Sequence, residues 1–471
     1  MTGDLESRAE ASYKPAADAH DEALAEQYAG DHRVVAIDTG RPVPPRDPEP
    51  GLADNLRALL RPWSDDEIEA AKVPWPHAFT YFDKGLFPIG EVTIIGARGR
   101  EGKTTVLTAV AVAAGVGRTI AGFRAEPTTT VIYSAEDDRG QYARKIGAQI
   151  AMLPGEREKI RHRILVPNLD DPTVAHAREI VTVIDRQPMQ AAAVDALIEA
   201  LLPLCEGEAP LRMVIFETAS TLSDADEDNR GHKTLIAGLK RVARALGVAV
   251  VLVHHTSQAA DNNLADLNLS TADIRGGTSL VFNSRQSWLL VNLGCDSDPF
   301  PDSDARTVLR RMITEGDPAA GEHKMLVLVP LDSSKSALPH PIFWQWAETV
   351  AYGPGAVDYE APDRIAGRSW RKLMEMVRAE RAERREVAKE ERKAATVDAR
   401  AQKVLLAIAH LGHSGEPATS RRIRVKAGVS ATVVGEVLSH LETTRQVASY
   451  EAVSGGQKCI AYRLTTGGTG E

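Results

Sequence analysis

The sequence predicts an α/β protein with a mostly parallel sheet, followed by a small C-terminal winged helix-turn-helix domain. Between residues 79 and 350, short apolar runs rich in β-branched residues alternate with helix-length segments. That alternation is typical of parallel strands covered by helices. After residue 400 the pattern changes to helix, helix-turn-helix and hairpin, which is the element order of a winged helix.

The composition is that of a soluble globular protein. The 471 residues are 43% hydrophobic and 26% charged, with a net charge of −9, so a protein that is basic all over is excluded. The start Met1–Glu6 is neither basic nor apolar, and no run of 18 apolar residues occurs. We therefore expect no signal peptide and no membrane span. Cys205, Cys295 and Cys459 lie far apart without metal-ligand spacing, which favours idle thiols in the cytoplasm.

The N-terminal 50 residues are polar and end in the proline-rich stretch Arg41–Pro50. Such a segment buries too little apolar surface to offset its ordering entropy, so residues 1–50 are predicted to be a disordered tail. Within residues 51–78 we expect a short helix, because Ser64 and Glu67 have the spacing of a capping box.

A phosphate-binding loop follows the first predicted strand, Val92–Ile95, and precedes a predicted helix, Val106–Ala114. The loop fits the pattern A/G-x-x-x-x-G-K-S/T, with Ala97 at a position usually given to Gly. Its backbone N–H groups and the helix N-terminus favour phosphate. Lys103 is expected to reach the β- and γ-phosphates, and Thr104 to bind Mg²⁺. The candidate ATP-binding residues here are Ala97, Arg98, Gly99, Arg100, Glu101, Gly102, Lys103, Thr104 and Thr105.

Two further predicted strands end in acids. Thr130–Ser134 leads to Glu136, which we expect to be the base that activates water, because it stands at a strand's carboxyl end facing the loop. Asp137 and Asp138 are interpreted as charges at the start of the next helix. Met213–Phe216 leads to Glu217, an acid of the Walker B kind that would hold Mg²⁺. The acid there is normally Asp, and a helix-capping or surface role for Glu217 stays open.

The remaining predicted strands are Arg163–Val166, Val248–Val253, Ser287–Val291 and Met325–Val329. The second of these ends in His254 and His255. No third ligand has metal-site spacing to this pair, so a polar relay that senses the γ-phosphate fits better. One of the two histidines is alternatively structural.

The ordered set of motifs resembles the RepA-type replicative helicases of plasmids and phages, of the AAA-25 family in the RecA/KaiC superfamily. The resemblance covers roughly residues 79–347. It rests on Gly85–Glu91, the loop, Ala135–Asp137, the apolar strand with its acid, His254–Thr256 and Arg275–Leu280. It implies a RecA-like P-loop ATPase core and a ring, usually a hexamer, with ATP between subunits and single-stranded DNA in the channel.

Several roles are carried over by position from this resemblance. Glu136 resembles the catalytic glutamate, His255 the sensor, and Arg285 the arginine finger given to a neighbouring subunit. Arg275 is an alternative finger, and an internal salt bridge is an alternative for either arginine. Lys335 resembles a late lysine element that would contact ATP. DNA-contacting residues are expected on loops facing the channel, with Asp261–Asp273 a candidate loop of unfavourably acidic character.

The C-terminal part divides into a charged helical linker, residues 351–400, and a winged-helix domain, residues 401–466. After residue 400 the basic positions 403, 421, 422, 424, 426, 445, 458 and 463 outnumber the acids at 416, 436, 442, 451 and 471 by 8 to 5. This excess favours duplex DNA as a ligand, although winged helices also dock proteins.

The sequence therefore predicts an ATP- and Mg²⁺-dependent DNA helicase or translocase of RepA type that forms a homo-oligomer. A DNA-binding regulatory or defence ATPase that switches oligomeric state is the alternative. A small-molecule kinase is disfavoured, since Glu136 and the two histidines suit the activation of water.

Overall fold

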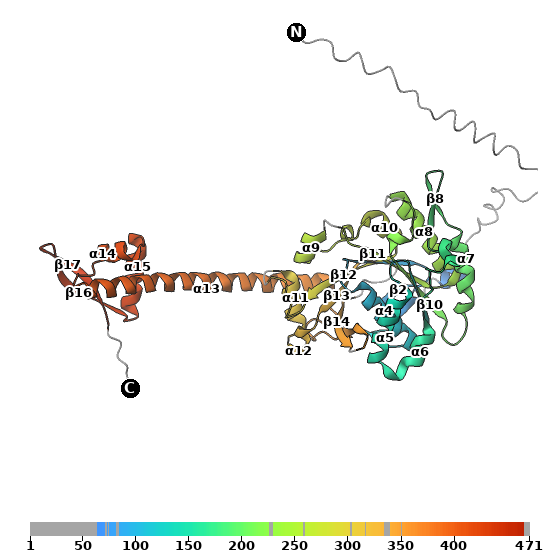
Figure 1. Cartoon of the computed structure of the whole chain (residues 1–471), viewed down its shortest axis with the longest axis horizontal. Helices are drawn as coiled ribbons and strands as arrows, with labels where there is room; N and C mark the ends of the chain where they lie inside the picture. Colours follow the sequence, from blue (N-terminus) through green and yellow to red (C-terminus); the bar gives the residue numbers. More distant parts are fainter. Residues whose placement is uncertain are drawn as a thin grey trace, which may run out of the picture. The chain divides into compact units, whose positions relative to one another are not determined.

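The structure is a computed structural model that describes residues 64–70, 73, 75–81, 84–225, 229–257, 260–301, 304–315, 317–333, 340–349 and 351–465 (Figure 1). The predicted tail, residues 1–50, and Lys335 lie outside these ranges. Helix α3 (Asp65–Ala70) begins at the predicted capping box. The Ser64 N–H donates to Glu67 Oε2 at 2.8 Å and the Glu67 N–H to Ser64 Oγ at 3.2 Å, so this prediction is confirmed.

The core of the described residues is a nine-stranded sheet in the order β15-β14-β13-β12-β3-β11-β10-β6-β7. From β12 to β7 the neighbouring strands run parallel, and β13, β14 and β15 add an antiparallel extension. The strands are β3 (Val92–Ala97), β6 (Thr129–Ser134), β7 (Ile164–Leu165), β10 (Leu211–Glu217), β11 (Ala249–His255), β12 (Gln286–Gly294), β13 (Met325–Ser333), β14 (Ile342–Thr349) and β15 (Gly353–Tyr359). The predicted α/β fold with a mostly parallel sheet is confirmed.

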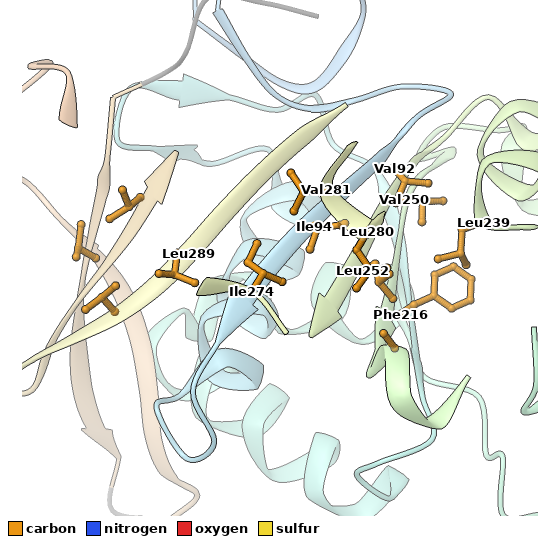
Figure 2. Close-up of a cluster of buried hydrophobic side chains, with 14 of the residues drawn as sticks. Val92, Ile94, Phe216, Leu239, Val250, Leu252, Ile274, Leu280, Val281 and Leu289 are labelled. Carbon is orange, nitrogen blue, oxygen red and sulfur yellow. The ribbon is translucent and has the colours of Figure 1, made fainter. Parts of the chain in front are cut away.

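Helices cover both faces of this sheet. Side chains of α4 (Lys103–Val116), α5 (Arg139–Met152) and α6 (Arg157–Arg163) pack on one face. The other face is covered by α7 (Ala193–Leu201), α8 (Asn229–Leu246), α10 (Gly277–Asn283) and α11 (Ala305–Ile313). Figure 2 shows this second core, where Leu239 and Leu280 lie over Ile94, Val250 and Leu252 of the central strands. Burial of both faces explains why these strands are continuous apolar runs in the sequence.

Two smaller sheets and two short helices accompany the main sheet in the described residues. Strands β1 (His77–Tyr81), β2 (Lys84–Pro88), β4 (Thr119–Ile120) and β5 (Phe123–Arg124) form a four-stranded sheet, and β8 (Val181–Ile184) pairs with β9 (Gln187–Gln190). Short helices α9 (Ala260–Asp266) and α12 (Pro318–Glu322) follow β11 and α11. The expectation of a loop over Asp261–Asp273 is therefore wrong for its first half. Asp273 also ends a 3₁₀ turn with a capping box to Ser270, because Ser and Asp at that spacing satisfy the turn's N–H groups.

The C-terminal part begins with α13 (Trp370–His413), a single helix that includes most of the predicted linker and the first helix of the predicted winged domain. It is followed by α14 (Ser420–Ala427), α15 (Ala431–Thr443) and the hairpin of β16 (Val447–Ser454) and β17 (Gln457–Leu464). Val404, Ile408, Ile423, Leu438 and Val447 belong to a separate small core. The predicted element order is present, and the winged-helix identity stays a prediction. Strand β15 lies inside the segment predicted as linker, so the sheet extends to Tyr359.

None of the described helices is long and apolar enough to cross a membrane.

Candidate nucleotide site

The predicted phosphate loop joins the carboxyl end of β3 to the first residue of α4. Arg100 and Gly102 have positive φ values of 64° and 86°, whereas Ala97 ends β3 in the extended region. An alanine is tolerated at position 97 because the left-handed turn of the loop is made elsewhere. Helix α4 begins at Lys103, so the unpaired N–H groups of its first turn lie at the loop, as phosphate binding requires.

Trp346 of β14 packs on this loop. A Cβ placed on Gly102 would lie 2.8 Å from the Trp346 ring, so position 102 needs glycine for space as well as for its φ value. The Lys324 ammonium lies 4.6 Å from the centroid of the same ring. The antiparallel extension of the sheet therefore supports the loop from a segment distant in sequence.

Four predicted side chains meet at the loop. Lys103 Nζ lies 3.2 Å from Glu136 Oε2 and 3.4 Å from Glu217 Oε1. Thr104 Oγ1 donates a hydrogen bond of 2.6 Å to Glu217 Oε1. Lys103, Thr104 and Glu217 are buried, whereas the Glu136 side chain is 38% exposed. The buried ion pair has its remaining polar atoms satisfied, which is the condition under which such a pair is tolerated.

The sheet order explains why these residues meet. Strand β10 is separated from β3 by β11 alone, and the carboxyl ends of all three lie at one edge. Alternation along β10 places Ile215 in the core beneath α4 and Phe216 in the opposite core. Glu217 therefore points to the face that carries α4.

Tyr142 of α5 is a site residue that the sequence analysis missed. Its hydroxyl donates to Glu217 Oε2, and the ring is 1% exposed. Burial, and then the Glu217 charge, raise the pKa of Tyr142, so the phenol stays protonated and serves as a donor. No local motif marks this residue, because its partner is 75 residues away in sequence.

The rest of the loop divides into an exposed and a buried part. Arg98, Gly99 and Arg100 are exposed, and Arg98 pairs with Asp261 of α9 at 3.4 Å. Glu101 is 8% exposed, and its burial, opposed by nearby cations led by Arg98, raises the pKa of its carboxyl. Thr105, in the first turn of α4, is buried.

Asp137 and Asp138 lie at the start of α5, where the sequence predicted them to be helix N-terminal charges. Asp138 is the N-cap of α5 and accepts from the Gln141 N–H at 2.7 Å. Asp137 pairs with Lys145 of the same helix. Neither carboxylate contacts Lys103 in this arrangement, which leaves Glu136 as the acid of that segment at the loop.

The histidine pair divides between the two faces of β11. His254 lies on the same face of β11 as Val250 and Leu252, which belong to the core of α8 and α10. His255 lies on the other face with Val251 and Val253, toward α4. His254 is 0% exposed, and neither of its ring nitrogens has a hydrogen-bond partner among the described residues. Burial, followed by the charge of His232, lowers its pKa to about 3.

His255, the predicted sensor, is half-buried and stands beside Ala97 in register. It therefore lies at the strand end nearest the phosphate loop, as a sensor must. The neutral, enclosed His254 has the structural role that the sequence analysis left open for one of the pair.

The two candidate arginine fingers lie at opposite ends of the sheet. The Arg285 N–H donates to the Val92 carbonyl at the amino end of β3, and Arg285 Nε lies 3.8 Å from the buried Glu91. The structure does not bring Arg285 to the loop of its own chain. The Arg275 N–H donates to the His255 carbonyl at 2.9 Å, so Arg275 stands at the phosphate edge. Arg285 forms an internal ion pair, which was one alternative, and a finger role in trans stays a prediction.

The donor set at the loop fits Mg²⁺. A hydroxyl and a carboxylate oxygen 2.6 Å apart, from Thr104 and Glu217, are the hard oxygen ligands that Mg²⁺ takes alongside phosphates and water. No group of three or more His, Cys, Asp or Glu side chains in the described ranges could hold a metal ion by itself.

Residues 57–261 match a family model described as an AAA domain. A solved structure described as "The Structure Of A DnaB-Like Replicative Helicase And Its Interactions With Primase" matches at 14% identity and a TM-score of 0.40, covering 74% of this chain and 73% of that chain. No curated protein matches. The matched segment contains the loop, Glu136, Glu217 and His255.

Proposed function

We propose that this chain is an ATP-hydrolysing, ring-forming DNA helicase or translocase of RepA type, acting in replication of a plasmid, phage or other mobile element. The observation that carries the ATPase part is the meeting of Lys103, Thr104, Glu136 and Glu217 at one edge of the sheet. Triphosphate hydrolysis needs a cation for the phosphates, oxygens for Mg²⁺ and a base for water. The ordered set of helicase-like motifs supports the motor part.

ATP binding changes the partners of Lys103. Its ammonium now contacts two carboxylates, and the β- and γ-phosphate oxygens would take their place. Glu136 is then released and, being partly exposed, takes a proton from water. The water oxygen bonds to the γ-phosphorus as the bond to the β–γ bridging oxygen breaks, giving ADP and phosphate. Mg²⁺, held by Thr104 and Glu217, would neutralise phosphate charge.

Glu136→Gln tests the assignment of the base. The amide keeps a water in place but does not accept its proton, so hydrolysis should fall by roughly 10²–10⁴-fold while Mg·ATP affinity is retained. The matched control is Asp138→Asn, which changes a neighbouring acid that caps α5 and should leave the turnover of folded protein near normal. Phosphate release and nucleotide binding are measured on both. Loss of binding in a folded Glu136→Gln protein would contradict the assignment.

The substitution Arg285→Ala tests whether the protein forms the proposed ring. In trans a finger contributes about 10³–10⁵-fold to hydrolysis, so Arg285→Ala should bind ATP and hydrolyse it poorly. Mixing Arg285→Ala with Lys103→Ala subunits should restore activity, since one interface then pairs an intact loop with an intact finger. Arg275→Ala is the matched alternative, and recovery with Arg275→Ala instead would assign the finger to the phosphate edge. A monomeric wild-type protein with Arg285-dependent hydrolysis would remove the ring from the proposal.

A second candidate is a regulatory or defence ATPase that binds DNA and switches oligomeric state. Two observations favour it: Glu217 stands where Asp is usual, and the acidic segment Asp261–Asp273 offers phosphate little attraction. Single-stranded DNA should stimulate hydrolysis by a motor. Unchanged hydrolysis together with nucleotide-dependent assembly would favour this second candidate.

A further inference from the structure

Between Arg378 and Lys403, helix α13 has a row of cations on one side and its acids on another. At roughly 100° per residue, one arc of about 100° contains basic side chains, and we call it the basic face of α13. Its members are Arg378, Arg385, Lys389, Arg392, Lys393, Arg400 and Lys403. The acids lie on a different arc, and they are Glu380, Glu383, Glu386, Glu390, Glu391 and Asp398. The sequence composition alone, a mixture of Arg, Glu, Lys and Ala, hides this separation.

The basic face is open to solvent. Every residue from 382 to 400 is exposed, and the helix there is supported by i,i+3 and i,i+4 pairs such as Arg384–Glu380 and Lys393–Glu390, both at 2.9 Å. None of the described residues forms an ion pair with Arg385 or Arg392. The charges of these two guanidinium groups, at the middle of the face, are therefore not neutralised by an ion pair within the described residues.

We propose that the basic face of α13 binds the phosphate backbone of a nucleic acid. From Arg378 to Lys403 the helix rises about 38 Å, the length of roughly eleven base pairs. A row of arginines and lysines along one side of an exposed helix matches a row of phosphates, and such contacts need charge without apolar surface. Except for Lys403, which belongs to the predicted winged-helix domain, the residues of this face have no role in the proposed function.

The side chains between the cations favour nucleic acid over an acidic protein. Within the arc they are Ala382 and Thr396, neither of which supplies the large apolar core typical of a protein interface. The exposed apolar residues of this segment, Val387 and Val397, fall on the acidic side. The same lack of apolar residues excludes the insertion of this face into a membrane surface.

Binding of the full-length chain to labelled duplex and single-stranded DNA of about 30 nucleotides tests the proposal by fluorescence anisotropy over a range of salt. The test variant is Arg385→Gln/Arg392→Gln. Glutamine keeps helix propensity, and far-UV circular dichroism checks the fold. The control is Lys372→Gln/Arg384→Gln, which removes the same charge from α13 outside the basic face and also removes two ion pairs.

The test variant should lose roughly tenfold in affinity, and its log–log salt slope should fall by about 2. The control should keep the wild-type slope. The duplex and single-strand arms show which form of nucleic acid binds this face. Equal losses in both variants, or no loss in either, would overturn the proposal. So would a change in oligomeric state confined to the test variant, which would make the occupant a second copy of this chain. The assay contains no nucleotide, so it is independent of ATP hydrolysis.

Discussion

A buried glutamate forms ion pairs near each end of β3, but the pairs are shared in opposite ways. At the carboxyl end one lysine, Lys103, is shared by Glu136 and Glu217. At the amino end one carboxylate, Glu91, is shared by several cations. Those cations are Lys240, Arg244 and Arg285, at 3.8, 3.4 and 3.8 Å.

The difference shows which end needs a ligand. At the carboxyl end a triphosphate would add negative charge beside two carboxylates that share Lys103, so we expect a divalent cation to offset the repulsion there. The amino end is a cluster of ion pairs around one buried carboxylate, and the side chains of Arg244 and Arg285 are partly exposed.

The largest expected effect is on Mg·ATP binding, which should depend on the carboxyl end of β3 and not on its amino end. Lys103→Ala removes the fixed cation of the loop, so Mg·ATP affinity and turnover should fall by at least about 10³-fold. Lys240→Ala removes a lysine from the opposite end and should leave Mg·ATP affinity unchanged. Isothermal titration of both variants measures this, and equal losses would show that the ends act as one site.

A second prediction tests the amino end as a stabilising cluster. Glu91→Gln leaves its cations around a neutral amide at a position that is 3% exposed, so the free energy of unfolding should fall by about 3 kcal/mol. Mg·ATP affinity of the folded fraction should not change. Urea denaturation is the measurement, and a wild-type midpoint would mean that solvent screens these charges.

A third prediction concerns the donor to Glu217. Tyr142→Phe leaves Glu217 Oε2 without its buried partner and should lower the free energy of unfolding by about 2 kcal/mol. It should also alter the Mg²⁺ concentration needed for ATP binding. The control, Tyr133→Phe, removes a hydroxyl that bonds the Ala177 carbonyl and should leave the Mg²⁺ requirement unchanged. An identical Mg²⁺ titration in both would contradict a role for Tyr142 in the metal site.

The smallest effect is a pH dependence from His254. Its pKa is lowered from 6.5 to about 3, so below pH 6.5 this imidazole is protonated in the unfolded chain and stays neutral in the folded one. Stability from this group is therefore lost as pH falls, by roughly 1 kcal/mol between pH 6.5 and 5.5. His254→Leu should remove that part of the slope, and His413→Gln, at an exposed site, should retain it. Equal slopes in all three proteins would contradict the prediction.

The sequence predicted what depends on local pattern. The loop, the strand before it and Glu136 lie within one continuous stretch, and the apolar strands are recognisable because both faces of the sheet are buried. Glu217 was also predicted, because an acid after an apolar strand comes to the same edge as the loop in a parallel sheet.

What the sequence did not predict depends on long-range packing. Tyr142 and Trp346 reach the site from α5 and β14, and nothing near them in sequence indicates their partners. Strand β15 lies in the predicted linker, and its Gly353-Pro354-Gly355 start gives no strand signal although it is tolerated at the edge of a sheet. Helix α9 was read as loop because its Asn and Asp residues are poor helix formers.

The contact between Trp346 and Gly102 bears on where this protein can be divided. The family match ends at residue 261, yet β12 pairs with β3 from Gln286 to Leu290 and β14 supports the phosphate loop. A fragment that ends at residue 261 would lack β12. Strand β3 would then be an exposed apolar edge strand, prone to pairing with other chains. The core over β3 also contains Ile365, Leu373 and Val377, so a piece that keeps the sheet and both cores extends to Val377, more than a hundred residues past the segment that the family model matches.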